Sequence, residues 1–165
     1  MKKIFSTLLL CSVFLFFGAF FANNTAHAQT ISQSGTTPLY RYYNGAEHFY
    51  TTSFSELGNG KDGYSFEGVQ CHVYTSSQSG TTPLYRYYNG TEHFYTTSFS
   101  ELGNGKAGYS LEGIQCYVYT SPQSGTTPLY RYYNGTEHFY TTSFDELGSG
   151  KSGYSLEGIQ CYVLP

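Results

Sequence analysis

Twelve residues, Ser34-Gly-Thr-Thr-Pro-Leu-Tyr-Arg-Tyr-Tyr-Asn-Gly45, occur three times in this chain. The same stretch begins again at Ser79 and at Ser124, so the period is 45 residues without insertion or deletion. Repeats 34–78 and 79–123 differ at 6 of 45 positions, and repeats 79–123 and 124–165 differ at 5 of the 42 that they share. Self-similarity at a fixed period decides the architecture of a repeat protein. It also predicts that a site carried by one copy is carried three times.

Each copy opens with a predicted β-hairpin. Aromatic and polar strand residues flank Asn44-Gly45, the pair that a two-residue type I′ turn favours. Such a turn would place Tyr43 opposite Ala46. In this register, one face of the hairpin carries Leu39, Arg41, Tyr43, His48 and Tyr50, and the other carries Tyr40, Tyr42, Glu47, Phe49 and Thr51.

The rest of each copy predicts a loop and two further strands. Residues 54–57 form a possible helical turn with Ser53 as its N-cap, and the glycines that follow end it. Residues 64–68 and 69–74 read as two short strands with a bulge or bend at Gly68. Each copy therefore offers about four short strands, which predicts an all-β, closed architecture.

The number and the similarity of the copies select among the architectures that repeat proteins adopt. A propeller typically needs about four or more blades, and a solenoid leaves bare sheet edges that call for atypical end copies. Three near-identical, four-stranded copies around a pseudo-threefold axis predict a β-trefoil.

The first 28 residues read as a secretory signal peptide. Lys2 and Lys3 precede the apolar run 4–21, and Ala26-His27-Ala28 forms a small-x-small cleavage site. An uncleaved membrane anchor is the alternative. We expect cleavage before Gln29, which leaves residues 29–165 as a single secreted domain, extracellular or periplasmic according to the host.

Charge and cysteine content exclude several classes of partner. Without Lys2 and Lys3, 6 basic residues remain of the 8 in the chain against 11 acidic ones, a net charge of −5. Nucleic acids and anionic membranes both require a basic face, so neither is expected as a partner. The three remaining cysteines, Cys71, Cys116 and Cys161, occupy one repeat position and read as small buried hydrophobic residues, with pairing of two or a shared metal site as alternatives.

The motifs Pro-Leu-Tyr-Arg-Tyr-Tyr-Asn, Glu-His-Phe-Tyr-Thr-Thr and Glu-Gly-Ile-Gln-Cys-Tyr-Val-Tyr carry a family resemblance. Over residues 38–162 the chain resembles the secreted repeat modules called domain of unknown function 5648. The resemblance implies a β-trefoil fold and secretion, often beside extracellular hydrolases, and it implies no activity. The Gln-x-Trp signature of trefoil lectins is absent because the chain has no Trp, so known sugar-site residues are not carried over.

One hairpin face holds the candidate ligand site. An aromatic ring, a guanidinium and an imidazole together suit a sugar or a small anion. The alternative is a cross-strand polar pair that only stabilises the sheet. The candidate residues are Arg41, Tyr43, His48, Arg86, Tyr88, His93, Arg131, Tyr133 and His138.

Three glutamates are secondary candidates, each followed by a glycine: Glu67, Glu112 and Glu157. They could accept hydrogen bonds from a sugar or bind Ca²⁺, or they could pair with the arginine of their own repeat. Convergence of the three histidines or three cysteines on one metal remains a further alternative. Glu47 and Glu67 could form the carboxylate pair of a glycosidase, but no catalytic motif accompanies them.

Together these features predict a secreted, non-catalytic, carbohydrate-binding module with up to three equivalent sites. Its expected partner is an extracellular glycan, and it is expected to act as a monomer without a cofactor. The alternatives are a module that binds a cell-surface protein through a Tyr-rich surface and, third, a secreted hydrolase.

Overall fold

The computed structural model describes residues 35–165. The predicted signal peptide, residues 1–28, lies outside the described residues. None of the helices in residues 35–165 is both long and apolar enough to cross a membrane.

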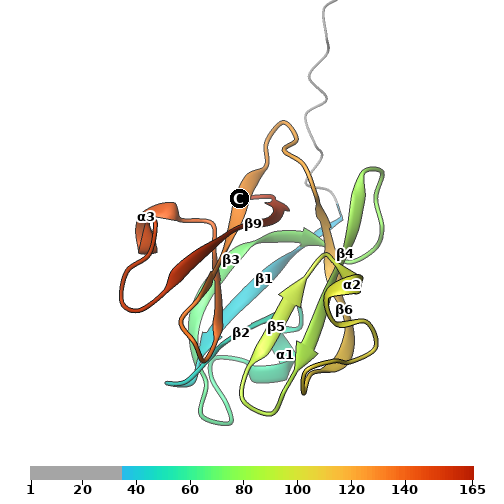
Figure 1. Ribbon diagram of the computed structural model, residues 1–165. Helices are drawn as coiled ribbons and strands as arrows, with labels where there is room; N and C mark the ends of the chain where they lie inside the picture. The colour runs from blue at the N-terminus through green and yellow to red at the C-terminus, as the bar shows by residue number, and fades with distance from the viewer. Residues whose placement is uncertain (1–34) are drawn as a thin grey trace, which may run out of the picture.

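Each repeat contributes three strands and one short helix, and the three repeats lie around a shared core (Figure 1). The first repeat contains β1 (Thr36–Tyr43), β2 (His48–Thr51), α1 (Phe54–Leu57) and β3 (Ser65–Tyr74). The second contains β4 (Thr81–Tyr88), β5 (His93–Thr96), α2 (Phe99–Leu102) and β6 (Ser110–Tyr119). The third contains β7 (Thr127–Tyr133), β8 (His138–Thr141), α3 (Phe144–Leu147) and β9 (Ser155–Val163). The all-β prediction is confirmed.

The hairpin of each repeat is closed by a longer loop than predicted. Tyr43 pairs with His48 and Arg41 with Tyr50, so the register is shifted by two residues. The cause is Asn44, whose Oδ1 accepts hydrogen bonds from the backbone N–H groups of Ala46 and Glu47, both at 2.9 Å, and thereby stabilises a four-residue loop. Because side chains alternate with period two, a shift of two leaves the predicted faces intact.

Residues 65–74 form one continuous strand, not the two short strands predicted. The ladder between β1 and β3 shifts register twice, so Gln70 and Glu67 are left without a paired residue on β1. Gly68 lies between them with φ of +135°, a conformation that glycine adopts most easily. The predicted bulge is therefore present, but it bends a single strand instead of ending one.

The predicted helical turn forms at Phe54–Leu57, with Ser53 in the N-cap position. The Ser53 side chain makes no capping hydrogen bond. Instead, the Thr51 hydroxyl accepts from the Ser53 N–H at 2.9 Å and donates to the Glu56 carboxylate. This contact fixes Glu56 at the edge of the repeat, where it faces a neighbour.

The long strands β3, β6 and β9 join the repeats. β3 meets β6 at Tyr74 and Tyr117, and β6 meets β9 at Tyr119 and Tyr162. An isolated antiparallel bridge then links His72 to Leu164, with N–H···O distances of 2.8 and 3.1 Å. The last repeat therefore contacts the first.

The core is built from the same four positions of every repeat. In the first repeat these are Leu39, Tyr50, Cys71 and Val73, each at most 2% exposed. The Tyr50 hydroxyl donates to the Tyr140 carbonyl oxygen at 2.7 Å and accepts from the Tyr140 N–H at 2.9 Å. Tyr95 binds Tyr50 and Tyr140 binds Tyr95 in the same way, so three buried tyrosines form a closed ring of hydrogen bonds.

Within residues 35–165, the cysteines are buried and unpaired; they are Cys71, Cys116 and Cys161. Burial raises the pKa of Cys71 to about 12, and it raises the pKa of Cys116 and Cys161 well above the ordinary thiol value. The interpretation of these residues as small core side chains is confirmed.

Candidate functional site

The arginine of each repeat lies at the seam with the neighbouring repeat. Arg41 contacts its own strand β3, with Nε at 2.8 Å from Glu67 and Nη1 at 3.0 Å from the Gln70 amide oxygen. Both partners are the unpaired residues of the bulged ladder, which shows that the bulges aim these side chains at Arg41. Across the seam, Arg41 lies 3.2 Å from Glu146 and over the Phe139 ring, 5.2 Å from its centroid.

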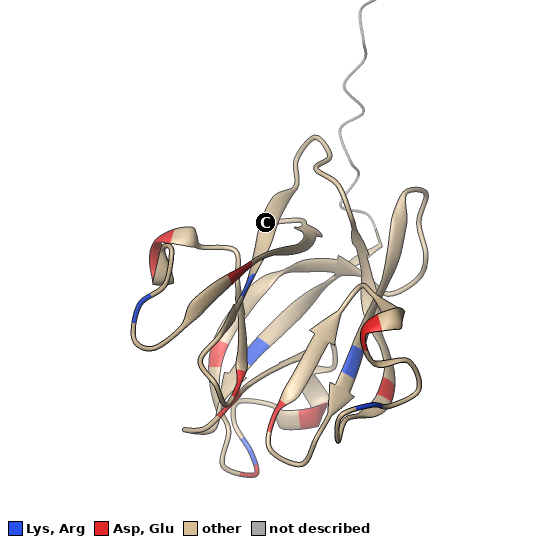
Figure 2. Ribbon diagram, viewed as in Figure 1, with Lys and Arg blue, Asp and Glu red and all other residues tan. Residues whose placement is uncertain are grey.

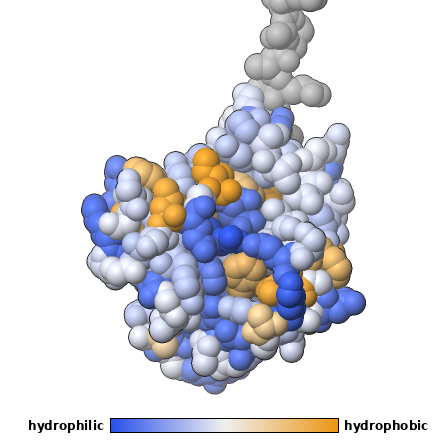
Figure 3. Space-filling view, viewed as in Figure 1, coloured by the Kyte–Doolittle hydropathy of each residue, from blue (hydrophilic) through white to orange (hydrophobic). Residues whose placement is uncertain are grey.

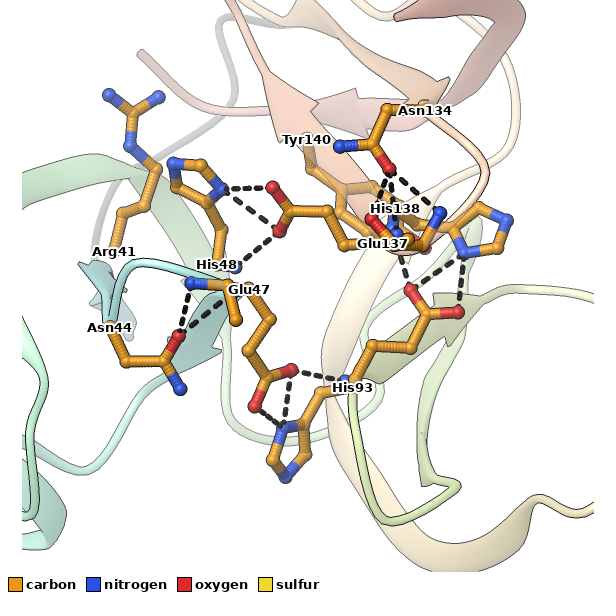
Figure 4. Close-up of polar contacts among 12 residues, drawn as sticks. Arg41, Asn44, Glu47, His48, His93, Asn134, Glu137, His138 and Tyr140 are labelled. Atoms are coloured by element: carbon orange, nitrogen blue, oxygen red, sulfur yellow. Dashed lines mark hydrogen bonds and ion pairs between the residues drawn. The ribbon is translucent and has the colours of Figure 1, made fainter.

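The histidine of the hairpin lies between two carboxylates. The His48 ring stacks on Tyr43, with 4.4 Å between centroids. Its Nδ1 is 3.1 Å from Glu137 of the third repeat, and its Nε2 is 3.6 Å from Glu67. The His48 backbone N–H donates to the same Glu137 carboxylate at 2.6 Å. Figure 4 shows Glu137 reaching across the seam to the His48 ring.

Glu137 is a buried carboxylate, 2% exposed, whose oxygens are fully used. Besides His48, it accepts a hydrogen bond from the Tyr154 hydroxyl of its own repeat. For the equivalent Glu92, burial alone would raise the pKa of the carboxyl group, but hydrogen bonds from His138 and Tyr109 outweigh burial and lower that pKa. An ionised carboxylate at this depth is stable only because it is bonded in this way.

The same contacts recur at each seam, and they run in one direction around the molecule. Glu137 binds His48, Glu47 binds His93 and Glu92 binds His138. The arginines follow the same order: Arg41 lies over Phe139, Arg86 over Phe49 and Arg131 over Phe94. Every repeat thus supplies an Arg–His pair to one neighbour and a Phe–Glu pair to the other.

The predicted Arg–Tyr–His set is brought together in all three repeats, but its members differ in accessibility. The Arg41 side chain is 18% exposed and the His48 side chain 13%, whereas Tyr88 and Tyr133 are both 37% exposed. Sequence reasoning found the set, but it missed the partners Glu137, Phe139 and Glu146, because near-identical repeats give no signal for contacts between copies.

The secondary glutamates pair with the arginine of their own repeat. Nε–carboxylate distances are 2.8 Å in the first repeat and 2.7 Å in the other two. Glu47 and Glu67, the carboxylates considered for glycoside cleavage, bind at different seams, Glu47 to His93 and Glu67 to Arg41. Within residues 35–165, no group of three or more His, Cys, Asp or Glu side chains is placed to hold a metal ion.

Clefts open at the seams. The cleft between the first and second repeats has a volume of about 280 Å³ and that between the second and third about 250 Å³. Apart from Asp62, the residues that line the two clefts come from equivalent positions of the repeats. The first is lined by Phe49, Glu56, Leu57, Asp62, Tyr64, Arg86, His93 and Glu112, and the second by Phe94, Glu101, Leu102, Tyr109, Arg131, His138 and Glu157.

A larger depression of about 740 Å³ lies where the three hairpin loops meet, and we call it the loop-end depression. Residues of the loops 44–47, 89–92 and 134–137 line it, together with Tyr43, Tyr109, Tyr133, Ser152 and Tyr154.

The family model of a domain of unknown function, DUF5648, matches residues 18–119 and again residues 61–164. No curated protein and no solved structure matches the chain. The two overlapping matches together span the three repeats whose motifs and seams are described above, and the chain belongs to the DUF5648 family.

Proposed function

We propose that this protein is a secreted, non-catalytic carbohydrate-binding module with a β-trefoil architecture. Secretion rests on the signal-peptide pattern of residues 1–28. N-terminal sequencing of the protein from culture medium should begin at Gln29, and a mature protein that retains residues 1–28 would contradict this part of the proposal.

The trefoil proposal is supported by the closed order of contacts among the repeats. The three copies make equivalent contacts, both in the buried ring of Tyr50, Tyr95 and Tyr140 and in the Glu–His pairs, which all run in one direction. The bridge from His72 to Leu164 joins the ends of the series. Such closure explains why the end copies need no capping sequence.

The observation that carries the carbohydrate proposal is the loose contact of the arginine across the seam. Arg86 binds Glu112 of its own repeat at 2.7 Å but Glu56 across the seam only at 3.4 Å. The corresponding distance from Arg131 to Glu101 is 3.6 Å. A cleft lies at this point, so the guanidinium and the carboxylate can each exchange a weak contact for a sugar hydroxyl.

Aromatic rings complete these clefts. Tyr64 lines the first and Tyr109 the second, and both are partly exposed, whereas Phe49 and Phe94 are buried beneath Arg86 and Arg131. A sugar presents apolar CH groups beside its hydroxyls, so a ring beside a charged pair recognises both. Single sites of this size should bind with about millimolar affinity, and the combination of several sites would give avidity toward a clustered glycan.

A glycan array tests the proposal with a variant that carries Glu56→Gln, Glu101→Gln and Glu146→Gln. These three glutamates are between 36% and 39% exposed at the seams. We expect the variant to lose at least about tenfold in apparent affinity, equivalent to about 1.4 kcal/mol. The control replaces Lys61, Lys106 and Lys151 with Gln, which removes three charges outside both described clefts. No glycan bound by the wild-type protein, or equal binding by both variants, would refute the seam sites.

Exposed apolar side chains favour a second candidate, a protein-binding module. Val69, Ile114 and Ile159 are about half exposed, and Phe54, Phe99 and Phe144 are 40–41% exposed. On the face in Figure 3, hydrophobic residues form separate patches divided by hydrophilic surface. If this candidate is correct, a pull-down from cell-surface extracts will recover a partner protein. Free sugars should not displace that protein, and the substitution Ile114→Ser should weaken its binding.

A further inference from the structure

We infer that the loop-end depression is a single additional binding site, for the end of one neutral, hydroxyl-rich chain such as an oligosaccharide. The inference rests on the proposed carbohydrate function for its ligand class, but it concerns a different place from the seam clefts, with which the depression shares only the lining residue Tyr109. The loop-end depression has a volume of about 740 Å³, which falls in the range of small-molecule sites in proteins.

The walls of the depression are held rigidly by the protein itself. In the second loop, the Asn89 side-chain oxygen accepts from the N–H groups of Thr91 and Glu92 at 2.9 Å and from the Thr91 hydroxyl at 2.8 Å. The Glu92 carboxylate then binds His138 of the next repeat. Each loop is thus anchored both to itself and to its neighbour. A preformed wall reduces the ordering cost that a ligand must overcome.

Two tyrosine rings offer a surface that suits a sugar. Tyr43 and Tyr133 line the depression, and each stacks on the histidine of its own hairpin with 4.4 Å between centroids. The histidine fixes the ring, and Tyr133 remains 37% exposed. Within residues 35–165, the hydroxyls of Tyr43 and Tyr133 make no hydrogen bond to the protein, so each is available to a ligand. Tyrosine supplies such contact area at low entropic cost.

The charge of the lining selects against anions. No Lys or Arg lines the depression, while the carboxylates of Glu92 and Glu137 lie in its wall. In the view of Figure 2, the basic residues are scattered among acidic ones and do not gather on one face. A phosphate or an acidic sugar would meet these carboxylates without a compensating cation. A neutral ligand pays no such penalty.

One loop differs from the other two, which makes the depression asymmetric. The first loop has Ala46 where the others have Thr91 and Thr136, whose hydroxyls bind the asparagines of their own loops. A ligand in the depression therefore meets a threonine from two of the loops and an alanine methyl group from the third. We expect one molecule to bind in one orientation, whereas the seams would take up to three.

The test uses the full protein in calorimetric titrations with maltotriose, cellotriose and tri-N-acetylchitotriose as neutral probes and trigalacturonic acid as the acidic one. We expect at least one neutral probe to bind with a stoichiometry near one, and the acidic probe to bind more weakly. Tyr133→Ala, which removes the ring, and Ala46→Leu, which fills the depression from an exposed loop position, should each weaken binding by at least about tenfold. Tyr133→Phe keeps the ring and should cause a smaller loss. Ser77→Leu, in an exposed connector, serves as the control and should leave binding unchanged.

The seam variant separates the two proposals. If the depression is a site, the neutral probe will still bind once to the protein that carries Glu56→Gln, Glu101→Gln and Glu146→Gln. If the seam variant loses that binding while Tyr133→Ala and Ala46→Leu retain it, the proposed site in the depression is overturned and the seam sites are supported. An absence of binding by any neutral probe up to about 10 mM, or tighter binding of the acidic probe, would also overturn it.

Discussion

The buried tyrosine ring shows how single hydroxyl groups hold the repeats together. Each hydroxyl of Tyr50, Tyr95 and Tyr140 serves both the N–H and the carbonyl group of another repeat. The rings meet edge to face with 5.5 Å between centroids. Burial raises the pKa of all three hydroxyls well above the ordinary value, which favours the protonated form that donates these hydrogen bonds.

Tyr95→Phe should therefore destabilise the protein. The substitution leaves the Tyr50 N–H and carbonyl group buried without a partner, and we expect a loss of at least about 2 kcal/mol in the free energy of unfolding. Urea denaturation measures this loss. Tyr88→Phe is the matched control, since its hydroxyl has no partner within residues 35–165, and it should change stability by less than about 0.5 kcal/mol. Equal effects of the two substitutions would rule out the role given to the ring.

The lowered pKa of Glu92 predicts a pH dependence. A carboxyl group whose pKa is lower in the folded than in the unfolded protein stabilises the fold above its unfolded pKa, near 4.5. That contribution is lost as the pH falls below about 4.5 toward the folded pKa. Glu92→Gln should lower stability at pH 7 and make the decline between about pH 5 and pH 3 shallower than in the wild-type protein. Asp62→Asn, at a side chain 69% exposed, is the control; a wild-type slope in Glu92→Gln would contradict the prediction.

At the scale of elements, the bulged strand β3 connects backbone geometry to the seam. Its two unpaired residues, Glu67 and Gln70, both reach Arg41. Gly68 permits this path with φ of +135°, and a Cβ atom there would meet no heavy atom within 4 Å. The requirement for glycine is therefore one of backbone conformation and not of space.

Gly68→Ala should cost about 1 to 3 kcal/mol of stability, because alanine rarely adopts this conformation. Thermal unfolding measures the loss, and Ser65→Ala, at the exposed start of β3, should have little effect. If Gly68→Ala leaves the midpoint of unfolding unchanged, the bulge tolerates a side chain and the argument fails.

Much of the structure within each repeat could be predicted from local sequence, but the contacts between repeats could not. The hairpin, the turn at 54–57 and the core position of Cys71 follow from neighbouring residues. The loop length was missed because the Asn44 side chain accepts hydrogen bonds from two backbone N–H groups and so stabilises a four-residue loop in place of the two-residue turn. The role of Glu137 was missed because the sequence around it is identical in two copies and cannot say which histidine it binds.

At the scale of the whole molecule, no repeat satisfies all of its buried polar groups by itself. The carboxylate of Glu92 needs a histidine of another copy, and the Tyr95 hydroxyl needs another backbone. Stability therefore comes from the seams, as in other repeat proteins whose units cannot bury a core alone.

A peptide of residues 79–123 should consequently be unfolded when dilute and should fold only by association of three copies. Sedimentation and circular dichroism across a range of concentrations would follow this change, because folding that requires assembly depends on concentration. A stably folded monomer of this peptide would contradict the dominance of the seams.

The bridge between His72 and Leu164 has a consequence for folding fidelity. At the other two junctions of the long strands, tyrosine meets tyrosine, at Tyr74 with Tyr117 and at Tyr119 with Tyr162. Because the copies are so similar, a repeat of one molecule can pair with that of another, and such domain swapping is a characteristic failure of repeat proteins. Among the three junctions within residues 35–165, the one between the first and third repeats carries a His–Leu pair, so its two sides differ from those of the other two junctions. Two substitutions thus distinguish the junction of the third repeat with a first repeat from the junctions that involve the second repeat.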